Sequence, residues 1–418
     1  MDRLAIIVAL IYCLHCSLAD VYTLVDNGNV TTSRTENELH KHLFKTYIPD
    51  IIPTLDDKPV IVNIEFFLIA IDDVDEKKQT IAVRAFLEVT WVDEKMTWDK
   101  ANFSGVDEIN VKNEALWIPD LTLTGTLGSL LDVGQTGGRA KVESNGKVTM
   151  WPYKLYTLAC KIAVAKFPMD EQRCDFDFLS WTNPTTVIQL RNPSGVINIE
   201  SMSESGEWDV KSQPTNIWQK TFGEDKWDHL TFQLLLRRKW LFHALNTMTP
   251  VVCISLLNVL CFLLPAQSGE RVTLCISIFL TLAVFLTVIN NAMPESSEEV
   301  AVFGLYVGLQ LIGSALTIFH VVLSIFLFHR DNAKPVPLIF RIMIKVCCVN
   351  PAKNASMLGK YSSCGALENG PIDKSGAIET KAQVSWKLVS LALDRMCLVG
   401  AVIWHTSLFL YLIHDLNN

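Results

Sequence analysis

The chain has 418 residues, of which 50% are hydrophobic, a mean hydropathy of +0.26 and a net charge of −8. This length suits two or three domains, and the negative charge argues against a nucleic-acid partner. The mean hydropathy is high for a water-soluble protein.

Residues 1–19, MDRLAIIVALIYCLHCSLA, have the pattern of a secretory signal peptide. A charged start at Arg3 precedes an apolar run, and Ser17-Leu18-Ala19 forms a small-residue cleavage site. The alternative is a buried first helix, which this pattern disfavours. We therefore expect the mature chain to begin near Asp20 and its first domain to be exported.

Residues 20–239 are polar and mixed, and they predict an antiparallel β-sandwich. Runs such as VIVNIEFFLIAI and TIAVRAFLEVTW alternate apolar and polar residues, with turn residues between the runs. Near the start, TENELHKHLFKTYI has helical spacing and predicts a short amphipathic helix. Sequons for N-glycosylation begin at Asn29 and Asn102. We expect four tryptophans to lie in the sandwich core or at its corners: Trp91, Trp98, Trp117 and Trp208.

Cys160 and Cys174 are the only cysteines in residues 20–239. Three arrangements are open: a disulfide, a metal site or two unrelated core cysteines. A metal site would need further ligands, and no histidine lies between or beside the pair. In an exported domain, a lone pair of cysteines favours a disulfide-closed loop.

Four apolar segments follow, each long enough to cross a hydrocarbon core about 30 Å thick. They predict four transmembrane helices, and a soluble core is a poor alternative for such long runs. The segments are 240–264, 272–289, 300–328 and 388–413.

The distribution of Lys and Arg among the links between the spans predicts which links lie inside the cell and which lie outside. With the first domain outside, the link 329–387 is cytoplasmic, and it carries nine Lys or Arg against four acids. The link after the second span contains PESSEE and is expected outside, as is the tail that ends the final domain, 388–418. Part of 329–387 (PLIFRIMIKVCC) favours a helix, whereas SSCGALENGPIDKSG has a disordered composition.

The loop carries a recognisable order of residues: Cys160, Ile162, Val164, Phe167, Pro168, Asp170 and Cys174. With LWIPD, FLSWT, GEWDV and FLLPAQSGERVTL, the chain resembles the Cys-loop pentameric ligand-gated ion channels. It is most similar to the cation-selective nicotinic acetylcholine branch, and next to the serotonin-gated branch. The resemblance implies a plasma-membrane pentamer of identical or related subunits, surrounded by lipid, and a postsynaptic location is one expectation that it raises. It also implies a small-molecule agonist, passage of monovalent cations, no cofactor and no enzymatic activity.

The second apolar segment has a polar stripe at helical spacing, which indicates a pore lining. Hydroxyls low on the stripe can solvate ions, and Leu280 with Val284 can form a gate that closes by dewetting. The alternative is that the hydroxyls only bond to the helix's own carbonyls. The stripe comprises Thr273, Ser277, Leu280, Val284, Thr287 and Asn291.

Glu270 precedes this stripe at the expected cytoplasmic mouth. Five copies would form a carboxylate ring that attracts cations. Anion-selective relatives typically have Pro-Ala at this point, where this chain has Ser268-Gly269-Glu270. At the outer mouth, Asn291 stands where nicotinic relatives often have an acid.

The resemblance implies an aromatic cage between neighbouring sandwiches that holds a cationic amine by cation–π attraction. Trp181 matches the central tryptophan and Trp227 the second tyrosine of the capping loop, with Trp218 or Phe222 as the other capping aromatic. Phe86, Thr149 and Trp151 are expected on the opposite face. The cage is incomplete, because Thr124 stands where a tyrosine is expected, and the adjacent cysteine pair of nicotinic α subunits is absent. The alternative is that these aromatics only pack the interface.

For coupling, relatives place the Phe-Pro tip of the loop, here Phe167-Pro168, against the membrane domain. They also pair an acid with an arginine before the first span, for which this chain offers Glu76 and Arg238. The alternative role for Arg238 is headgroup anchoring. The incomplete cage leaves two further hypotheses open: gating by another ligand such as protons or an amphiphile, and an accessory subunit without its own agonist site.

Overall fold

The computed structural model describes residues 34–56, 58–127, 131–133, 137–266, 268–294, 300–331, 336–346 and 386–417. The expected signal peptide, the sequon at Asn29 and most of the link 329–387 lie outside the described residues. The chain divides into two compact units. The first comprises the chain through Ile162 together with Glu171–Arg237, and the second comprises Ala163–Asp170 together with the chain from Arg238 onward.

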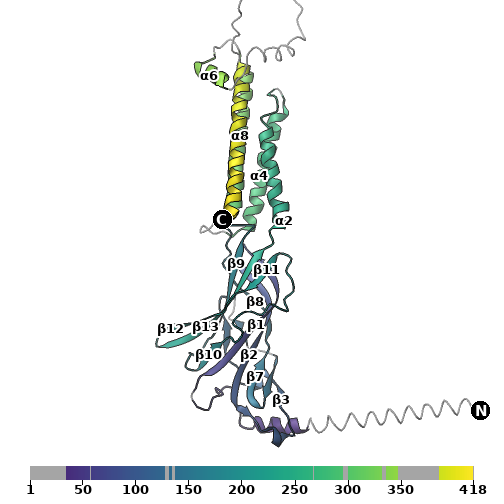
Figure 1. Ribbon diagram of the computed structural model, residues 1–418, viewed down its shortest axis with the longest axis vertical. Helices are drawn as coiled ribbons and strands as arrows, with labels where there is room; N and C mark the ends of the chain where they lie inside the picture. Colours follow the sequence, from purple (N-terminus) through teal and green to yellow (C-terminus); the bar gives the residue numbers. More distant parts are fainter. Residues whose placement is uncertain are drawn as a thin grey trace, which may run out of the picture. The chain divides into compact units, whose positions relative to one another are not determined.

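The first unit is a two-sheet sandwich with a helix at residues 34–43 (Figure 1). Among the described residues, one sheet has the order β10-β1-β2-β7-β6-β3, with β8 also paired to β2. Its strands are β1 (Val60–Asp75), β2 (Thr80–Thr97), β3 (Glu108–Lys112), β6 (Arg139–Glu143), β7 (Asn145–Met150), β8 (Tyr153–Ala159) and β10 (Ile188–Arg191).

The other sheet has the order β11-β13-β9-β4-β5 within the described chain, with β12 also paired to β13. Its strands are β4 (Leu121–Leu123), β5 (Leu131–Asp132), β9 (Glu171–Ser180), β11 (Trp208–Ser212), β12 (Asn216–Phe222) and β13 (Asp225–Arg238). The predicted sandwich with its short N-terminal helix is thus confirmed.

Aromatic side chains fill the space between the sheets. Phe66 on β1 lies with its ring centroid 5.3 Å from that of Phe176 on β9 and 5.5 Å from that of Phe232 on β13. Alternate residues of β1 are buried while their neighbours are not, as a strand with one core face requires. The four tryptophans expected in the core, Trp91, Trp98, Trp117 and Trp208, are each at most 8% exposed.

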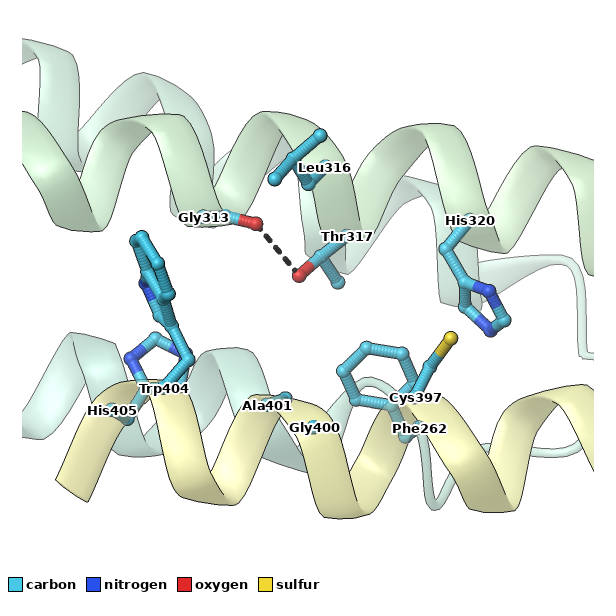
Figure 2. A pocket seen from close by; sticks show the side chains of 10 residues that line it. All are labelled: Phe262, Gly313, Leu316, Thr317, His320, Cys397, Gly400, Ala401, Trp404 and His405. Carbon is cyan, nitrogen blue, oxygen red and sulfur yellow. Dashed lines mark hydrogen bonds between the residues drawn. The ribbon is translucent and has the colours of Figure 1, made fainter. Parts of the chain in front are cut away.

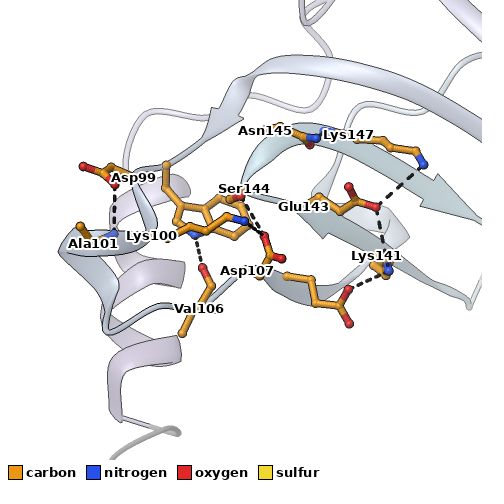
Figure 3. Close-up of polar contacts among 12 residues, drawn as sticks. Asp99, Lys100, Ala101, Val106, Asp107, Lys141, Glu143, Ser144, Asn145 and Lys147 are labelled. Atoms are coloured by element: carbon orange, nitrogen blue, oxygen red, sulfur yellow. Dashed lines mark hydrogen bonds and ion pairs between the residues drawn. The ribbon is translucent and has the colours of Figure 1, made fainter.

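The far edge of the first sheet carries a surface network of ion pairs (Figure 3). Lys141 contacts Glu108 at 2.7 Å and Glu143 at 3.9 Å, which connects β3 to β6, and Lys100 pairs with Asp107 nearby. Exposed pairs of this kind contribute little to stability. Gly146, the second residue of β7, has a φ of +83°, and a Cβ there would lie 2.5 Å from the Asp93 carbonyl oxygen, so the close approach of β7 to β2 requires glycine.

Cys160 and Cys174 form a disulfide, which confirms the predicted pairing. Cys160 directly follows β8 and Cys174 lies in β9, so the bond connects the two sheets. In the chain-entropy model, closing a loop of this length contributes roughly 3 kcal/mol. The tip of the loop, Ala163–Asp170, groups with the second unit rather than with the sandwich.

The second unit contains the helices α2 (Leu241–His243), α3 (Thr249–Leu260), α4 (Glu270–Ala292), α5 (Val302–Phe328), α6 (Leu338–Val346) and α8 (Trp386–Asn417), with a π-helical turn, Ala244–Met248, between α2 and α3. Within the described residues, four stretches are long and apolar enough to span a membrane: Leu241–Leu260, Glu270–Ala292, Val302–Phe328 and Trp386–Leu416. They correspond to the four predicted transmembrane helices. α6 lies in the link 329–387, where the sequence favoured a helix.

Candidate functional site

A cavity of about 430 Å³ lies on the sandwich where β9 ends beside the β12–β13 hairpin. Trp181, which directly follows β9, and Phe222, which ends β12, are 54% and 50% exposed at this cavity. The cavity is lined by Thr124, Leu179, Trp181, Lys220, Phe222, Trp227 and His229. Four residues expected at the ligand site, Thr124, Trp181, Phe222 and Trp227, are therefore together.

Asp120 holds the segment that carries Trp181. Its side chain accepts hydrogen bonds from both the backbone nitrogen and the hydroxyl of Thr182 at 2.6 Å, and from Nδ2 of Asn183 at 3.0 Å. The Asp120 carbonyl accepts from the backbone nitrogen of Trp181 at 3.3 Å. Sequence reasoning missed this positioning role, although Asp120 ends the LWIPD motif that it had noted.

The hairpin separates the two candidates for the capping aromatic. The Phe222 ring lies edge-on to Trp227 at 5.6 Å and lines the cavity, whereas Trp218 stacks on His229 at 4.1 Å. Trp218 also donates from Nε1 to the Thr231 hydroxyl at 3.1 Å, so it supports the wall from outside the lining. Phe222 therefore fits the capping position better than Trp218.

Beneath this wall, Asp177 accepts hydrogen bonds from Nδ1 of His229 at 2.7 Å, from the Thr231 hydroxyl at 2.9 Å and from the Thr124 hydroxyl at 3.2 Å. Thr124 is thus a hydrogen-bonded part of the lining rather than an aromatic one. The group ties β9 to β13 directly under the cavity.

Lys220 is the cationic residue in this lining, and sequence reasoning missed it. Its ammonium lies 4.8 Å from the centroid of the Phe222 ring, and its side chain lines the cavity. A cation over an aromatic face gains cation–π attraction. Lys220 therefore already supplies a cation to one wall of the aromatic cavity.

The residues expected on the opposite face lie on the other sheet. Phe86 on β2 stacks on Phe67 with the ring centroids 4.6 Å apart. Trp151 is 45% exposed and donates from Nε1 to Glu88 at 3.2 Å. Thr149 is only 3% exposed, which does not fit contact with a ligand. Tyr153, which pairs with Phe86 across the strands and is 57% exposed, adds an aromatic ring that the sequence reasoning had not included.

The predicted pore stripe lies on one exposed side of α4. Leu280 is 58% and Val284 62% exposed in the subunit, and Glu270, Thr273, Ser277, Thr287 and Asn291 are also exposed. The hydroxyls of Ser277 and Thr287 donate to carbonyls one turn earlier, at 2.8 and 2.9 Å. The alternative of self-bonded hydroxyls thus describes these two residues. It does not exclude ion contact, because the donating oxygens keep lone pairs for a cation.

The first two residues of α4, Glu270 and Arg271, are both charged but lie in different environments. Glu270 is exposed, whereas Arg271 is fully buried and donates to Asp394 on α8 at 2.8 and 3.0 Å. The arginine charge is therefore neutralised inside the helix bundle. Glu270 is left as the charge at the start of the exposed stripe.

Arg238 at the end of β13 is 3% exposed and donates from Nε to Asp170 at 2.9 Å. Its guanidinium lies 5.2 Å from the Phe167 ring, which also contacts His243 edge-on at 5.1 Å. Sequence reasoning named Arg238 and Phe167 but missed Asp170, which stands two residues after Pro168 in the loop motif. The expected partner Glu76 belongs to the first unit, and its pairing with Arg238 stays a prediction.

The loop tip also contacts the start of α5, where the backbone nitrogen of Val302 donates to the Ala165 carbonyl at 3.0 Å.

Asn102, in a short 3-10 turn, is exposed, and its glycosylation stays a prediction. Among the described residues, no group of three or more His, Cys, Asp or Glu side chains is placed to hold a metal ion.

Two family models match this chain in succession. Residues 36–240 match the neurotransmitter-gated ion-channel ligand binding domain, and residues 247–346 match the neurotransmitter-gated ion-channel transmembrane region. The chain therefore belongs to the neurotransmitter-gated ion channels, the Cys-loop receptors, and not to an enzyme family. This confirms the resemblance drawn from the loop motif.

The similar relatives are neuronal acetylcholine receptor subunits. The chain is 34% identical to the alpha-2 subunit of Gallus gallus over 71% of its own length, and the match covers 56% of that relative. It is 29% identical to the beta-3 subunit of Homo sapiens over 85% of its length, covering 78% of that relative. Against the beta-4 subunit of Gallus gallus, the identity is 29% over 73% of the chain and 64% of the relative.

Proposed function

We propose that the chain is a subunit of a cation channel in the plasma membrane, opened by a small extracellular cationic amine bound between subunits. The observation that carries this proposal is the aromatic cavity of Trp181, Phe222 and Trp227 on the sandwich surface. Three aromatic side chains around a space of about 430 Å³ suit an organic cation, which gains ~2 kcal/mol or more from a desolvated cation–π contact.

The positions of the two half-sites support binding between subunits. The cavity belongs to the sheet containing β9 and β13, whereas Phe86 and Tyr153 belong to the sheet containing β2 and β8, and Trp151 lies in the link between β7 and β8. One chain thus offers two different surfaces, which meet when copies associate head to tail, and such an interface closes into a ring. The proposal includes a pentamer of identical or related subunits, embedded in lipid with both chain ends outside, and membership of the family supports assembly into pentamers.

The exposed stripe of α4 supports passage of monovalent cations. Five Glu270 carboxylates would concentrate cations at one mouth, while the buried Arg271–Asp394 pair keeps the neighbouring positive charge out of the pore. Leu280 and Val284 supply a hydrophobic constriction without charge.

The position of Lys220 in the cavity supports a second candidate function. Its ammonium lies over Phe222, where an agonist cation would bind, so the cavity is partly satisfied by the protein itself. A subunit with this arrangement suits either a channel opened by another stimulus, such as protons or an amphiphile, or an accessory subunit that relies on a partner's site.

The chain expressed alone in oocytes, perfused with a panel of amines and a pH series, tests the proposal. Amine-evoked currents are expected whose reversal potential shifts when external sodium is diluted and stays unchanged when chloride is replaced. Trp181→Ala should shift the half-maximal concentration at least about tenfold, and Trp181→Phe, which keeps an aromatic face, should shift it less. Currents that follow pH alone, or an unchanged amine response in Trp181→Ala at normal surface expression, would move the agonist site elsewhere.

A further inference from the structure

A cavity of about 260 Å³ lies between α5 and α8 in the membrane-spanning part of the chain, far along the sequence from the aromatic site (Figure 2). Small residues create the space, with Gly313 on α5 and Gly400 and Ala401 on α8. A Cβ at Gly313 would lie 2.7 Å from Nε1 of Trp404, so glycine lets the indole lie against α5. Leu316, at the cavity wall, is 62% exposed, which indicates that the cavity opens to the lipid-facing surface.

One end of this cavity holds a thiol beside an oriented imidazole. The sulfur of Cys397 points toward the ring of His320 (Figure 2), and Nε2 of His320 lies 2.9 Å from Oδ1 of Asp394. The Asp394 carboxylate accepts from Nε2 and so fixes the orientation of the ring beside the thiol. Arg271 fixes Asp394 in turn.

The other end of the cavity presents a buried polar atom. His405 is 7% exposed, and its Nδ1 has no hydrogen-bond partner among the described residues. The Asn258 amide nitrogen lies 3.4 Å from Nε2 of His405. With the Asn258 amide in this orientation, its nitrogen donates to Nε2, and Nδ1 is then the protonated nitrogen that can donate to a guest. A buried donor without an acceptor is costly, so a carbonyl oxygen on a guest would be favoured here.

We infer that this cavity is a covalent modification site, in which Cys397 adds to a membrane-soluble α,β-unsaturated carbonyl compound. The sulfur forms a bond to the β-carbon, and the electron pair of the carbon–carbon double bond moves toward the carbonyl group. The thiol proton is transferred to the α-carbon with the help of the neighbouring imidazole of His320. One S–H bond and one π bond are lost while one S–C and one C–H bond form, so no oxidant or leaving group is needed.

The geometry also specifies the shape of the compound. Cys397 and His405 are eight positions apart on one helix, on the order of 12 Å along its axis. The matching compound is therefore elongated and apolar, with its electrophilic carbon at Cys397 and a hydrogen-bond acceptor toward His405. A charged reagent is disfavoured, because the cavity is reached from the hydrocarbon.

The chain offers an internal control, because Cys253 on α3 is more exposed than Cys397 but does not line this cavity. Purified receptor is treated with N-hexylmaleimide, and the rate at each cysteine is read by peptide mapping. We expect Cys397 to react at least about tenfold faster than Cys253, as assistance by a positioned base predicts. If Cys253 reacts as fast or faster, exposure controls reactivity and the proposal is wrong.

Two variants separate the roles of the residues. His320→Asn should bring the Cys397 rate to within about twofold of the Cys253 rate, because the proton acceptor is lost. Ala401→Phe fills the cavity and should slow labelling of Cys397 while His320 stays in place. The Cys253 rate reports any general loosening of the fold. An unchanged Cys397 rate in both variants overturns the proposal.

A second probe tests the far end. A maleimide with the same chain length but a ketone near its end should label Cys397 faster than N-hexylmaleimide, and His405→Phe should remove that advantage. An equal rate for both probes in the wild-type chain would show that His405 does not select the guest.

Discussion

Arg271 on α4 and Asp394 on α8 form a bidentate ion pair, with nitrogen–oxygen distances of 2.8 and 3.0 Å, across 123 positions of sequence. Arg271 also donates from Nε to the Cys261 carbonyl at 3.1 Å, and its side chain is fully buried. The pair thereby joins α4 to α8. Because Arg271 is buried, Glu270, the residue directly before it, has no positive charge from α4 beside it on the exposed side of that helix.

Asp394→Asn is expected to destabilise the helix bundle, because it leaves the Arg271 charge buried without compensation. Removing one partner of a buried pair costs about 3–5 kcal/mol. Thermal unfolding of the detergent-purified protein and surface labelling should both show the loss. Arg395→Gln is the matched control, since Arg395 adjoins Asp394 but is exposed. Replacing both partners, Arg271→Met with Asp394→Leu, should recover part of the stability, and a double variant as unstable as Asp394→Asn would contradict this account.

Glu270→Gln is expected to lower cation conductance or selectivity with little change in agonist sensitivity, because it removes the charge at one mouth and no contact at the ligand cavity. Leu280→Thr should have the reverse pattern. A hydroxyl would wet the constriction, favour the open state and raise agonist sensitivity while the selectivity stays cationic. Reversal potentials under sodium and chloride dilution measure both. Wild-type currents that reverse near the chloride potential would refute the carboxylate-ring account.

Lys220→Gln is expected to increase the apparent affinity for cationic amines by roughly tenfold, because a like charge leaves the aromatic cavity and the Phe222 face becomes available. Lys220→Arg, which keeps the charge and stacks on aromatic rings, should not increase it. Concentration–response curves for a set of amines provide the measurement. An identical response in the Gln and Arg variants would show that the Lys220 charge has no influence at this site.

Asp120→Asn is expected to weaken amine responses roughly tenfold without loss of assembly, because an amide nitrogen cannot accept the hydrogen bonds that orient the segment after β9. The effect should act through Trp181. In a Trp181→Ala background, Asp120→Asn should therefore cause little further change. Additive losses in the double variant would show that Asp120 acts independently of Trp181.

Tyr47→Phe is expected to destabilise the sandwich by about 1–3 kcal/mol. The Tyr47 hydroxyl donates to the fully buried Asp93 at 2.6 Å and accepts from the backbone nitrogen of Trp117 at 2.8 Å, so both partners lose their hydrogen bond.

The same variant has a signed pH dependence. Burial raises the pKa of Asp93 above its ordinary value, and the Tyr47 hydrogen bond partly offsets this rise. Without that bond the folded-state pKa rises further. The folded state then binds the proton more tightly than the unfolded state, and stability falls as the pH rises through the interval between the two pKa values. Melting temperatures should therefore differ more between variant and wild type at neutral pH than in mild acid, and a larger difference in acid would contradict this sign.

Local pattern was sufficient for the architecture. Alternation along residues 60–71 identified a strand with one buried face, because period two places every second side chain in the core. Length and apolar composition identified the four membrane helices, since a hydrocarbon core accepts few other structures. Helical spacing similarly gathered Thr273, Ser277, Leu280 and Val284 on one exposed side of α4. In each case the physical rule acts between residues close in sequence.

Only the tertiary structure decided the partners that are distant in the chain. Sequence placed Arg271 beside Glu270, but the fold buries one against Asp394 and exposes the other. It left open which of Trp218 and Phe222 is the second aromatic residue beside Trp227. Phe222 lines the aromatic cavity, whereas Trp218 stacks across the strands on His229. Thr149 and Lys220 could not be placed by alignment, because which face a strand residue presents depends on the register of its sheet. These outcomes depend on contacts between segments far apart in sequence, which no local periodicity encodes.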